Sequence, residues 1–238
     1  MSKPVELISL ARLALTFLPV AVVVGVLYRW SLGAGTTLYA MGRMLLQLLL
    51  VGYVLTYVFT TDQPWLVGGV LTGMLTIASW IALRPLQGQG SRQYAKALGS
   101  IALGGVFTLL LVTQCVLDTQ PWFSPSKVIP LAGMIFANSM TAISLAAERF
   151  YAELPRAASY EAARGIALRA ALIPITNSLF AVGLVSLPGM MTGQILANVD
   201  PLIAARYQIM VMAMLFGSAG ISAACYLTLI KPKNSVMN

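Results

Sequence analysis

A short stretch of mixed charge contains the residues that are best suited to binding another protein. Residues 148 to 169 read ERFYAELPRAASYEAARGIALR and hold seven of the 22 charged residues of the chain. Aromatic rings are interleaved with both signs of charge, which suits a specific protein partner better than a purely basic, lipid-binding face would. The alternative is a solvated loop that only sets orientation. We name residues 148 to 169 the charged segment, and its candidate contact residues are Glu148, Arg149, Glu153, Tyr160, Glu161, Arg164 and Arg169.

Enzyme chemistry finds little support in the sequence. The chain has no G-x-x-x-x-G-K-[ST] phosphate loop, no G-x-S-x-G elbow, no H-E-x-x-H motif and no paired-cysteine motif. It has no histidine, so the commonest metal ligand and the usual near-neutral proton carrier are both missing. We therefore expect no catalytic residue and no cofactor bound by this chain, and the sequence assigns no metal ligands.

Polar residues within the hydrophobic runs form a second group of candidates, because such residues usually face a bundle interior or a water-filled path. Asn138, Thr141 and Ser144 follow spacings of three, with Ser139 beside them, and this pattern predicts a polar stripe along one helix. Hydrogen bonding between helices is the alternative role. The same reasoning adds Arg43, Gln47 and Asn177 to the candidate substrate pathway.

The segment SLPGMMTGQILANVDP, residues 186 to 201, is the other distinctive stretch. Pro188 and Gly189 are expected to stop the preceding helix. Met190 and Met191 carry soft, polarizable thioethers, and Gln194 adds an amide, so these three residues join the candidate pathway. The sequence leaves open whether this segment is a packing turn, a re-entrant loop or a site.

The elements that must position these residues are membrane-spanning helices. The composition is 58% hydrophobic and 9% charged, whereas roughly a quarter of the residues in a soluble domain are charged. About 20 mostly apolar residues cross the hydrocarbon as a helix, which satisfies every backbone group. We therefore predict an all-α bundle that forms one transmembrane domain over residues 1 to 238. Its seven expected spans are Ile8 to Tyr28, Leu38 to Phe59, Trp65 to Leu83, Leu98 to Leu117, Val128 to Ala147, Ala170 to Leu187 and Gln208 to Ile230.

The distribution of basic residues predicts the orientation. Eleven lie on one side of the expected spans, while Lys3, Arg12, Lys127 and Arg206 lie on the other, together with Asp62 and the two remaining aspartates. Because cytoplasmic loops are enriched in Lys and Arg, the N-terminus should be outside and the C-terminus in the cytoplasm. The net charge of +8 is then an orientation signal and a contact with anionic membrane lipid, and we expect no nucleic-acid partner.

A proline divides the charged segment. Residues up to Leu154 can extend the fifth span as a helix, and Pro155 then disfavours helical geometry at the residue before it. A second helix can begin at Arg156 or Ser159. From residue 160 to residue 169 it would be short and amphipathic, lying at the membrane surface before the chain turns into the sixth span.

Four stretches of the chain carry a family resemblance. They are RMLLQLLLVGYVL from Arg43, IPLAGMIFANSMTAISLAAERF from Ile129, YEAARGIALRAALIPITNSLFAVGLVSLPGMMTGQIL from Tyr160 and PLIAARYQIMV from Pro201. Together they make the chain similar to the bacterial iron export permease family FetB, whose relatives include plant aluminium-sensitivity membrane proteins. The LPGMMTGQIL string is the most specific part, and the resemblance extends from the second expected span to the seventh.

The resemblance implies a permease subunit of an ATP-binding cassette exporter, located in the cell inner membrane. A separate FetA-like ATPase would bind ATP and Mg²⁺, which agrees with the missing phosphate loop. The charged segment would couple the two subunits, and a homodimer of permeases would serve two ATPase subunits.

Iron is the substrate that the resemblance implies. Ferrous iron prefers imidazole and carboxylate ligands, and the expected spans contain no histidine and no carboxylate well inside them. A chelate or a different substrate therefore stays open. The alternatives in other functional classes are a stand-alone secondary transporter or channel, and a membrane scaffold without a transport path.

Overall fold

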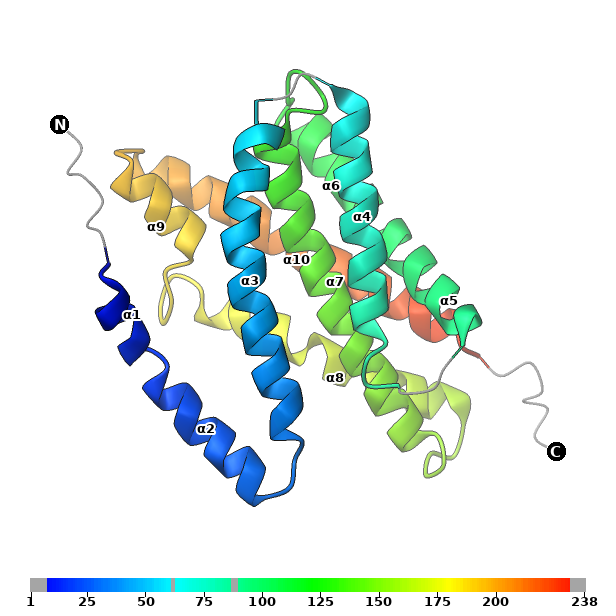
Figure 1. Cartoon of the computed structure of the whole chain (residues 1–238). Helices are drawn as coiled ribbons and strands as arrows, with labels where there is room; N and C mark the ends of the chain where they lie inside the picture. Colours follow the sequence, from blue (N-terminus) through cyan, green and yellow to red (C-terminus); the bar gives the residue numbers. More distant parts are fainter. Residues whose placement is uncertain (1–7, 61–62, 87–89, 232–238) are drawn as a thin grey trace. The chain divides into compact units, whose positions relative to one another are not determined.

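A computed structural model describes residues 8–60, 63–86 and 90–231. Within these ranges the chain is all-helical, as predicted, apart from an isolated β-bridge between Val182 and Ser186. The chain divides into two compact units, Met1–Thr60 and Thr61–Asn238, which are described separately (Figure 1). The prediction of one transmembrane domain stays a prediction. Three residues used to predict the orientation, Lys3, Asp62 and Lys233, lie outside the described residues.

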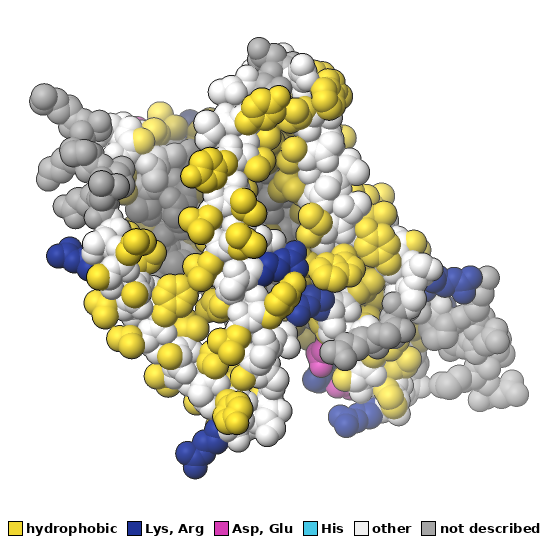
Figure 2. All heavy atoms as spheres, viewed as in Figure 1, with side chains coloured by type: hydrophobic (Ala, Val, Ile, Leu, Met, Phe, Trp, Pro, Cys, Tyr) yellow, Lys and Arg dark blue, Asp and Glu magenta, His cyan; other side chains and the backbone are white. Residues whose placement is uncertain are grey.

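The first unit contains helices α1 (Leu10–Leu15), α2 (Leu18–Arg29) and α3 (Ala34–Val58). Pro19 lies in the first turn of α2, where its missing N–H leaves no helical hydrogen bond unmade. Gly33 turns the chain into α3 with a φ of 75°, a conformation that glycine adopts without strain. Hydrophobic side chains cover the visible faces of α2 and α3 (Figure 2), and no residue of α1 or α2 is buried. Such apolar surface suits contact with lipid.

The second unit is organised around one long helix, α7 (Pro125–Glu153), which packs against α4, α8 and α10. Buried residues recur every three to four positions along α7 from Leu131 to Phe150, so one wide face of the helix forms the core. Alanines at several of these positions let neighbouring helices approach closely. The other elements of the unit are α4 (Pro64–Ala82), α5 (Ser91–Ile101), η1 (Ala102–Val106), α6 (Phe107–Leu110), η2 (Leu111–Val116), α8 (Tyr160–Ala181), α9 (Gly189–Leu196) and α10 (Pro201–Leu229).

The fourth expected span contains two π-helical turns, η1 and η2. Gly104 and Gly105 lie in η1 at its contact with other helices. A Cβ atom on Gly104 would come within 2.9 Å of the backbone nitrogen of Ser222 on α10, and one on Gly105 within 3.0 Å of the Phe136 ring on α7. The close approach of the α10 backbone leaves no room for a larger residue at Gly104, whereas a larger residue at Gly105 would require the Phe136 ring to shift.

Six described segments are long and apolar enough to cross a membrane. They are Leu10–Arg29, Ala34–Val58, Pro64–Ala82, Ser91–Val116, Pro125–Glu153 and Pro201–Leu229. The predicted count of seven is not confirmed, and neither is the predicted orientation. The difference lies in the sixth expected span, Ala170 to Leu187.

The predicted surface helix and the sixth span are one continuous helix, α8, so the expected turn between them was wrong. The sequence across this boundary, IALRAALI at residues 166 to 173, contains no glycine or proline, and its alanines favour a continuous helix. Helical geometry ends at Ala181, before Leu187. Residues 170 to 181 span about 18 Å as a helix, short of the roughly 30 Å of a hydrocarbon core.

Candidate functional site

The charged segment forms the junction between α7 and α8. α7 ends at Glu153, as the break expected at Pro155 requires. Of the two predicted helix starts, the structure selects Ser159, whose hydroxyl accepts a 3.2 Å hydrogen bond from the N–H of Ala162. Glu161 lies in the first turn of α8, where a carboxylate interacts favourably with the helix dipole.

Tyr160 fixes this junction to the end of α10. Its hydroxyl donates a 2.6 Å hydrogen bond to the carbonyl oxygen of Leu227. Its ring meets the Phe150 ring edge-on, with the ring centroids 5.7 Å apart. Tyr160 is 5% exposed and Phe150 1% exposed. The expectation that the Tyr160 ring contacts a partner directly is therefore corrected, because this residue positions the charged segment from inside.

Two cations flank the Tyr160 ring. The guanidinium carbon of Arg164 lies 5.5 Å from the ring centroid, and the Nζ of Lys231 lies 5.4 Å from it. Burial raises the pKa of Tyr160, and the charge and hydrogen bonding of Arg164 oppose that rise. The hydroxyl therefore stays protonated at neutral pH and can donate to Leu227. Lys231 also lies 4.0 Å from the carboxylate of Glu161.

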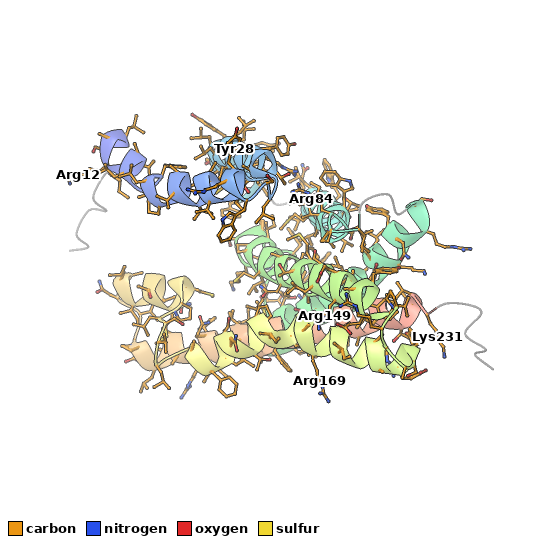
Figure 3. All side chains as sticks on the ribbon, turned by 90° about the horizontal axis from the view of Figure 1, so that it is seen from below. Arg12, Tyr28, Arg84, Arg149, Arg169 and Lys231 are labelled. Atoms are coloured by element: carbon orange, nitrogen blue, oxygen red, sulfur yellow. The ribbon has the colours of Figure 1, made fainter. Side chains whose placement is uncertain are left out.

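The charges of the charged segment face outward. Glu153 is the exception, since it is half-buried and pairs with Arg149 at 2.8 Å. Figure 2 shows acidic and basic side chains together where α7 ends, and Figure 3 shows Arg169 pointing outward from α8. Exposed ion pairs contribute little to stability. The exposed members are Glu148, Arg149, Arg156, Glu161, Arg164 and Arg169.

Two of the predicted pathway residues meet at a cavity of about 340 Å³ between α7, α8, α9 and α10. Asn138 on α7 and Met190 on α9 line it together with Gln208 on α10. The Nδ2 of Asn138 donates a 3.0 Å hydrogen bond to the carbonyl oxygen of Met134, so the amide oxygen remains as an acceptor. No residue that lines this cavity is charged. We name it the amide cavity.

A second cavity of about 510 Å³ adjoins the amide cavity and shares Met134 and Met190 with it. Gln194, another predicted pathway residue, lines this second cavity, and its amide oxygen is buried with no hydrogen-bond partner among the described residues. Lys127 is the one charged residue in its lining. We name it the wide cavity.

The predicted polar stripe on α7 is divided among different surroundings. Ser144 donates a 2.8 Å hydrogen bond to the carbonyl oxygen of Ala82 on α4, whereas Thr141 is exposed and bonds to its own helix. Ser139 is fully buried. Three residues advance roughly 300° around a helix, so a spacing of three drifts by about 60° per step. Only Asn138 of these four lines a cavity described above.

The remaining pathway candidates lie elsewhere. Met191 lines a third cavity, of about 440 Å³, with mostly apolar neighbours. Asn177 is exposed on α8. Arg43 and Gln47 belong to α3 in the first unit, which is described separately. The structure thus brings together three of the predicted residues, Asn138, Met190 and Gln194, around two adjoining cavities.

Gln208 is the site residue that the sequence reasoning missed. It is 6% exposed, and its amide oxygen accepts no hydrogen bond from any described residue. It lines both the amide cavity and the third cavity. The available signal is an amide in a long apolar run, but the predicted seventh span begins at Gln208 itself. α10 begins two turns earlier, at Pro201, so Gln208 lies within the helix.

Apart from Lys127 in the wide cavity, the side chains that line these cavities are neutral. The described residues contain no group of three or more His, Cys, Asp or Glu side chains that could hold a metal ion. The cavities offer amide oxygens, hydroxyls and thioethers instead. Such a site can bind a ligand by hydrogen bonds or by soft coordination.

Comparison with known proteins identifies related membrane proteins. The model of an uncharacterised protein family, UPF0014, matches residues 10–163 and 153–234. The UPF0014 membrane protein slr1647 of Synechocystis sp. is 39% identical over 199 residues, which cover 76% of each chain. The probable iron export permease protein FetB of Escherichia coli is 38% identical over 219 residues, which cover 83% of this chain and 82% of that protein.

A plant protein shows the breadth of this similarity. ALUMINUM SENSITIVE 3 of Arabidopsis thaliana is 31% identical over 206 residues, which cover 79% of this chain and 73% of that protein. No solved structure matches the chain. The resemblance drawn from the LPGMMTGQIL string is confirmed, and the apolar helices agree with a multi-pass membrane protein. The chain therefore belongs to the UPF0014 family of membrane proteins.

Proposed function

We propose that this chain is the permease subunit of an ATP-driven exporter in the cell inner membrane, and that it moves iron or a related metal species. The observation that carries the proposal is the 38% identity, over 83% of the chain, to the protein named as a probable iron export permease. The sequence has no phosphate loop. ATP and Mg²⁺ would therefore bind to a separate FetA-like cassette ATPase, and this chain itself would be no enzyme.

The charged segment is the contact that we propose for the ATPase. Its exposed charges surround the junction of α7 and α8, and Tyr160 ties that junction to α10. A movement of the partner at this junction would reach α7, α8 and α10 together. The same three helices, with α9, line the amide cavity. The segment could thus transmit ATP-driven movement to the substrate path.

The amide and wide cavities form the proposed substrate path. Asn138 lies near the middle of the 29-residue helix α7, whose length of about 43 Å exceeds the hydrocarbon core. The amide cavity therefore lies at membrane depth if α7 spans the bilayer. Polar groups at that depth are costly and usually serve a path.

A homodimer is the assembly that we propose for the permease. Two identical chains related by two-fold symmetry would present two charged segments, one for each of two ATPase subunits. This arrangement lets both ATPase subunits act on equivalent junctions. Crosslinking of the purified complex would give its stoichiometry.

Purification and reconstitution test the proposed function. The chain, purified in mild detergent from its native membrane, should bring a cassette ATPase with it. Inside-out vesicles that contain both proteins should accumulate iron only when ATP is present. Transport by the chain alone, driven by an ion gradient, would instead identify a stand-alone secondary transporter or channel.

A further inference from the structure

We propose that the exposed face of α8 is the homodimer interface of this chain, with the Asn177 side chains of two copies hydrogen-bonded to each other. This pairing rests on the proposed function, in which α7 spans the bilayer and the permease is a homodimer, and it assigns the surface at which the two copies meet. Three observations carry it: an exposed amide at membrane depth, apolar side chains around that amide, and a non-helical segment beside it.

Asn177 lies on a continuous exposed face of α8. Arg169 points outward from this helix (Figure 3), and Ile173 and Asn177 follow it at steps of four, which keep to one side of a helix. Phe180 continues the same side three residues later. Ile173 is 55% exposed and Phe180 is 78% exposed. We name the residues Ile173, Asn177 and Phe180 the outer α8 face.

The outer α8 face lies at the depth of the amide cavity. Ile175 and Ser178 line that cavity together with Asn138, which lies near the middle of α7, so Asn177 between them lies at a similar depth. The Asn177 side chain is exposed and has no hydrogen bond to any described residue. Lipid chains offer no hydrogen-bonding group, so an unpaired amide that faces them is unfavourable. A protein partner that hydrogen-bonds to the amide removes this cost.

The segment that follows α8 needs a cover as well. α8 ends at Ala181, and residues 182 to 188 are not helical. Three residues of this segment line the amide cavity, so it lies at the same depth. Non-helical backbone at membrane depth occurs where protein or a water-filled cavity covers it, and not against lipid. Leu184 is 90% exposed and Val185 is 85% exposed, and such apolar side chains favour a protein cover over water.

A second copy of this chain is the partner that fits. The ATPase of the proposed assembly contacts the charged segment outside the hydrocarbon, so it does not reach Asn177. A two-fold axis can bring a residue of one copy against the same residue of the other, and an amide carries both a donor and an acceptor. Two Asn177 side chains can therefore exchange hydrogen bonds while Ile173 and Phe180 pack around them. A single asparagine fixes the pairing of two helices in the same way in coiled coils.

Disulfide crosslinking at position 177 tests the pairing. Asn177→Cys is introduced into the full-length chain with Cys115 and Cys225 replaced by alanine, and membranes that contain it are treated with a mild oxidant. We expect a reducible dimer, because a disulfide forms only where the two Cα atoms come within about 7 Å. Leu179→Cys is the matched control and should stay monomeric. Leu179 is 38% exposed and lies at nearly the same depth, but it points about 200° away from Asn177 around α8.

Dimer dissociation separates hydrogen bonding from mere proximity. We expect Asn177→Leu to raise the dissociation constant of the dimer in detergent by about three- to tenfold, the range that one or two hydrogen bonds between helices produce. Ser178→Ala removes a neighbouring hydroxyl that bonds only to Pro174 on its own helix, so it should leave the constant unchanged. Asn177→Gln keeps an amide and should dimerise nearly as tightly as the unchanged chain. Sedimentation equilibrium measures each constant.

The outcomes are separable from the test of the proposed function, because neither experiment needs ATP, iron or an ATPase. The interface is wrong if Leu179→Cys crosslinks as completely as Asn177→Cys, or if Asn177→Leu dimerises as tightly as the unchanged chain. A dimer that forms without crosslinking at position 177 would overturn this interface and keep the proposed homodimer. A chain that pairs through Asn177 but recruits no cassette ATPase would overturn the proposed function alone.

Discussion

The Tyr160 hydroxyl donates a 2.6 Å hydrogen bond to the carbonyl oxygen of Leu227, which lies 67 residues later in the chain. Leu227 belongs to the last turn of α10, where the final carbonyl groups of a helix have no helical partner. One hydrogen bond thus caps the end of α10 and holds the start of α8. The buried Tyr160 therefore holds the charged segment in position, while the charged side chains of that segment stay exposed.

Replacing Tyr160 by phenylalanine should lower stability without displacing the ring. The change leaves the Leu227 carbonyl without its partner, and we expect a loss of about 1 kcal/mol in the free energy of unfolding. Thermal unfolding of the purified protein in detergent measures it. Tyr53→Phe is the control, because Tyr53 is 83% exposed. Equal melting temperatures for the two variants would contradict the assigned role of the hydroxyl.

Charge reversal in the charged segment should uncouple the two subunits. Glu161→Lys combined with Arg164→Glu changes two exposed residues of α8, so we expect normal expression but no stimulation of the partner's ATPase and no export. Losing one partner of a buried interfacial charge pair costs about 2 to 5 kcal/mol, whereas rim pairs cost little. Arg206→Glu, exposed near the start of α10, serves as the control. Normal coupling in the double variant would mean that the segment only sets orientation.

The divided polar stripe provides a matched pair of substitutions. We expect Asn138→Leu to reduce transport several-fold, because it removes an amide from the amide cavity. The sequence predicted the same for Thr141→Val, but Thr141 is exposed and bonds only to Ala137 on its own helix. We now expect that variant to transport normally. ATP-dependent uptake into vesicles compares them, and a loss confined to Thr141→Val would exclude the amide cavity as the path.

A methyl group added at Gly104 should disturb the contact between η1 and α10. It would lie within 2.9 Å of the Ser222 backbone, and overpacking of this kind typically costs about 1 to 3 kcal/mol. Gly99→Ala is the matched control, because no atom lies within 4 Å of a Cβ there. Thermal unfolding should show a lower melting temperature for Gly104→Ala than for Gly99→Ala. The reverse order would mean that the helices separate easily.

Accessibility labelling checks the predicted orientation. Ser126 and Ala158 are exposed near opposite ends of α7, and we expect Ser126→Cys to react from outside and Ala158→Cys from the cytoplasm. Ala158 is preferable to Ser159, whose hydroxyl caps α8. The background lacks Cys115 and Cys225, and the reagent is an impermeant maleimide. Labelling of Ala158→Cys from outside would overturn the whole topology.

Much of the local structure follows from the sequence alone. The all-helical fold depends on long apolar runs, the break after α7 on the missing N–H and ring of Pro155, and the start of α8 on the hydroxyl of Ser159. Each of these effects acts over a few neighbouring residues. Family membership was equally accessible, because LPGMMTGQIL is a contiguous string.

The tertiary structure decided which of the candidate residues form a site. Helical spacing placed Asn138 and Thr141 in one stripe, but only the packing of α7 against α8, α9 and α10 shows that Asn138 alone lines a cavity. Gln208 and Tyr160 acquire their roles from contacts with elements far away in the chain. Such contacts depend on which helix faces meet. In a membrane, the faces that contact lipid and the faces that contact protein are both apolar, so the sequence carries little signal to distinguish them.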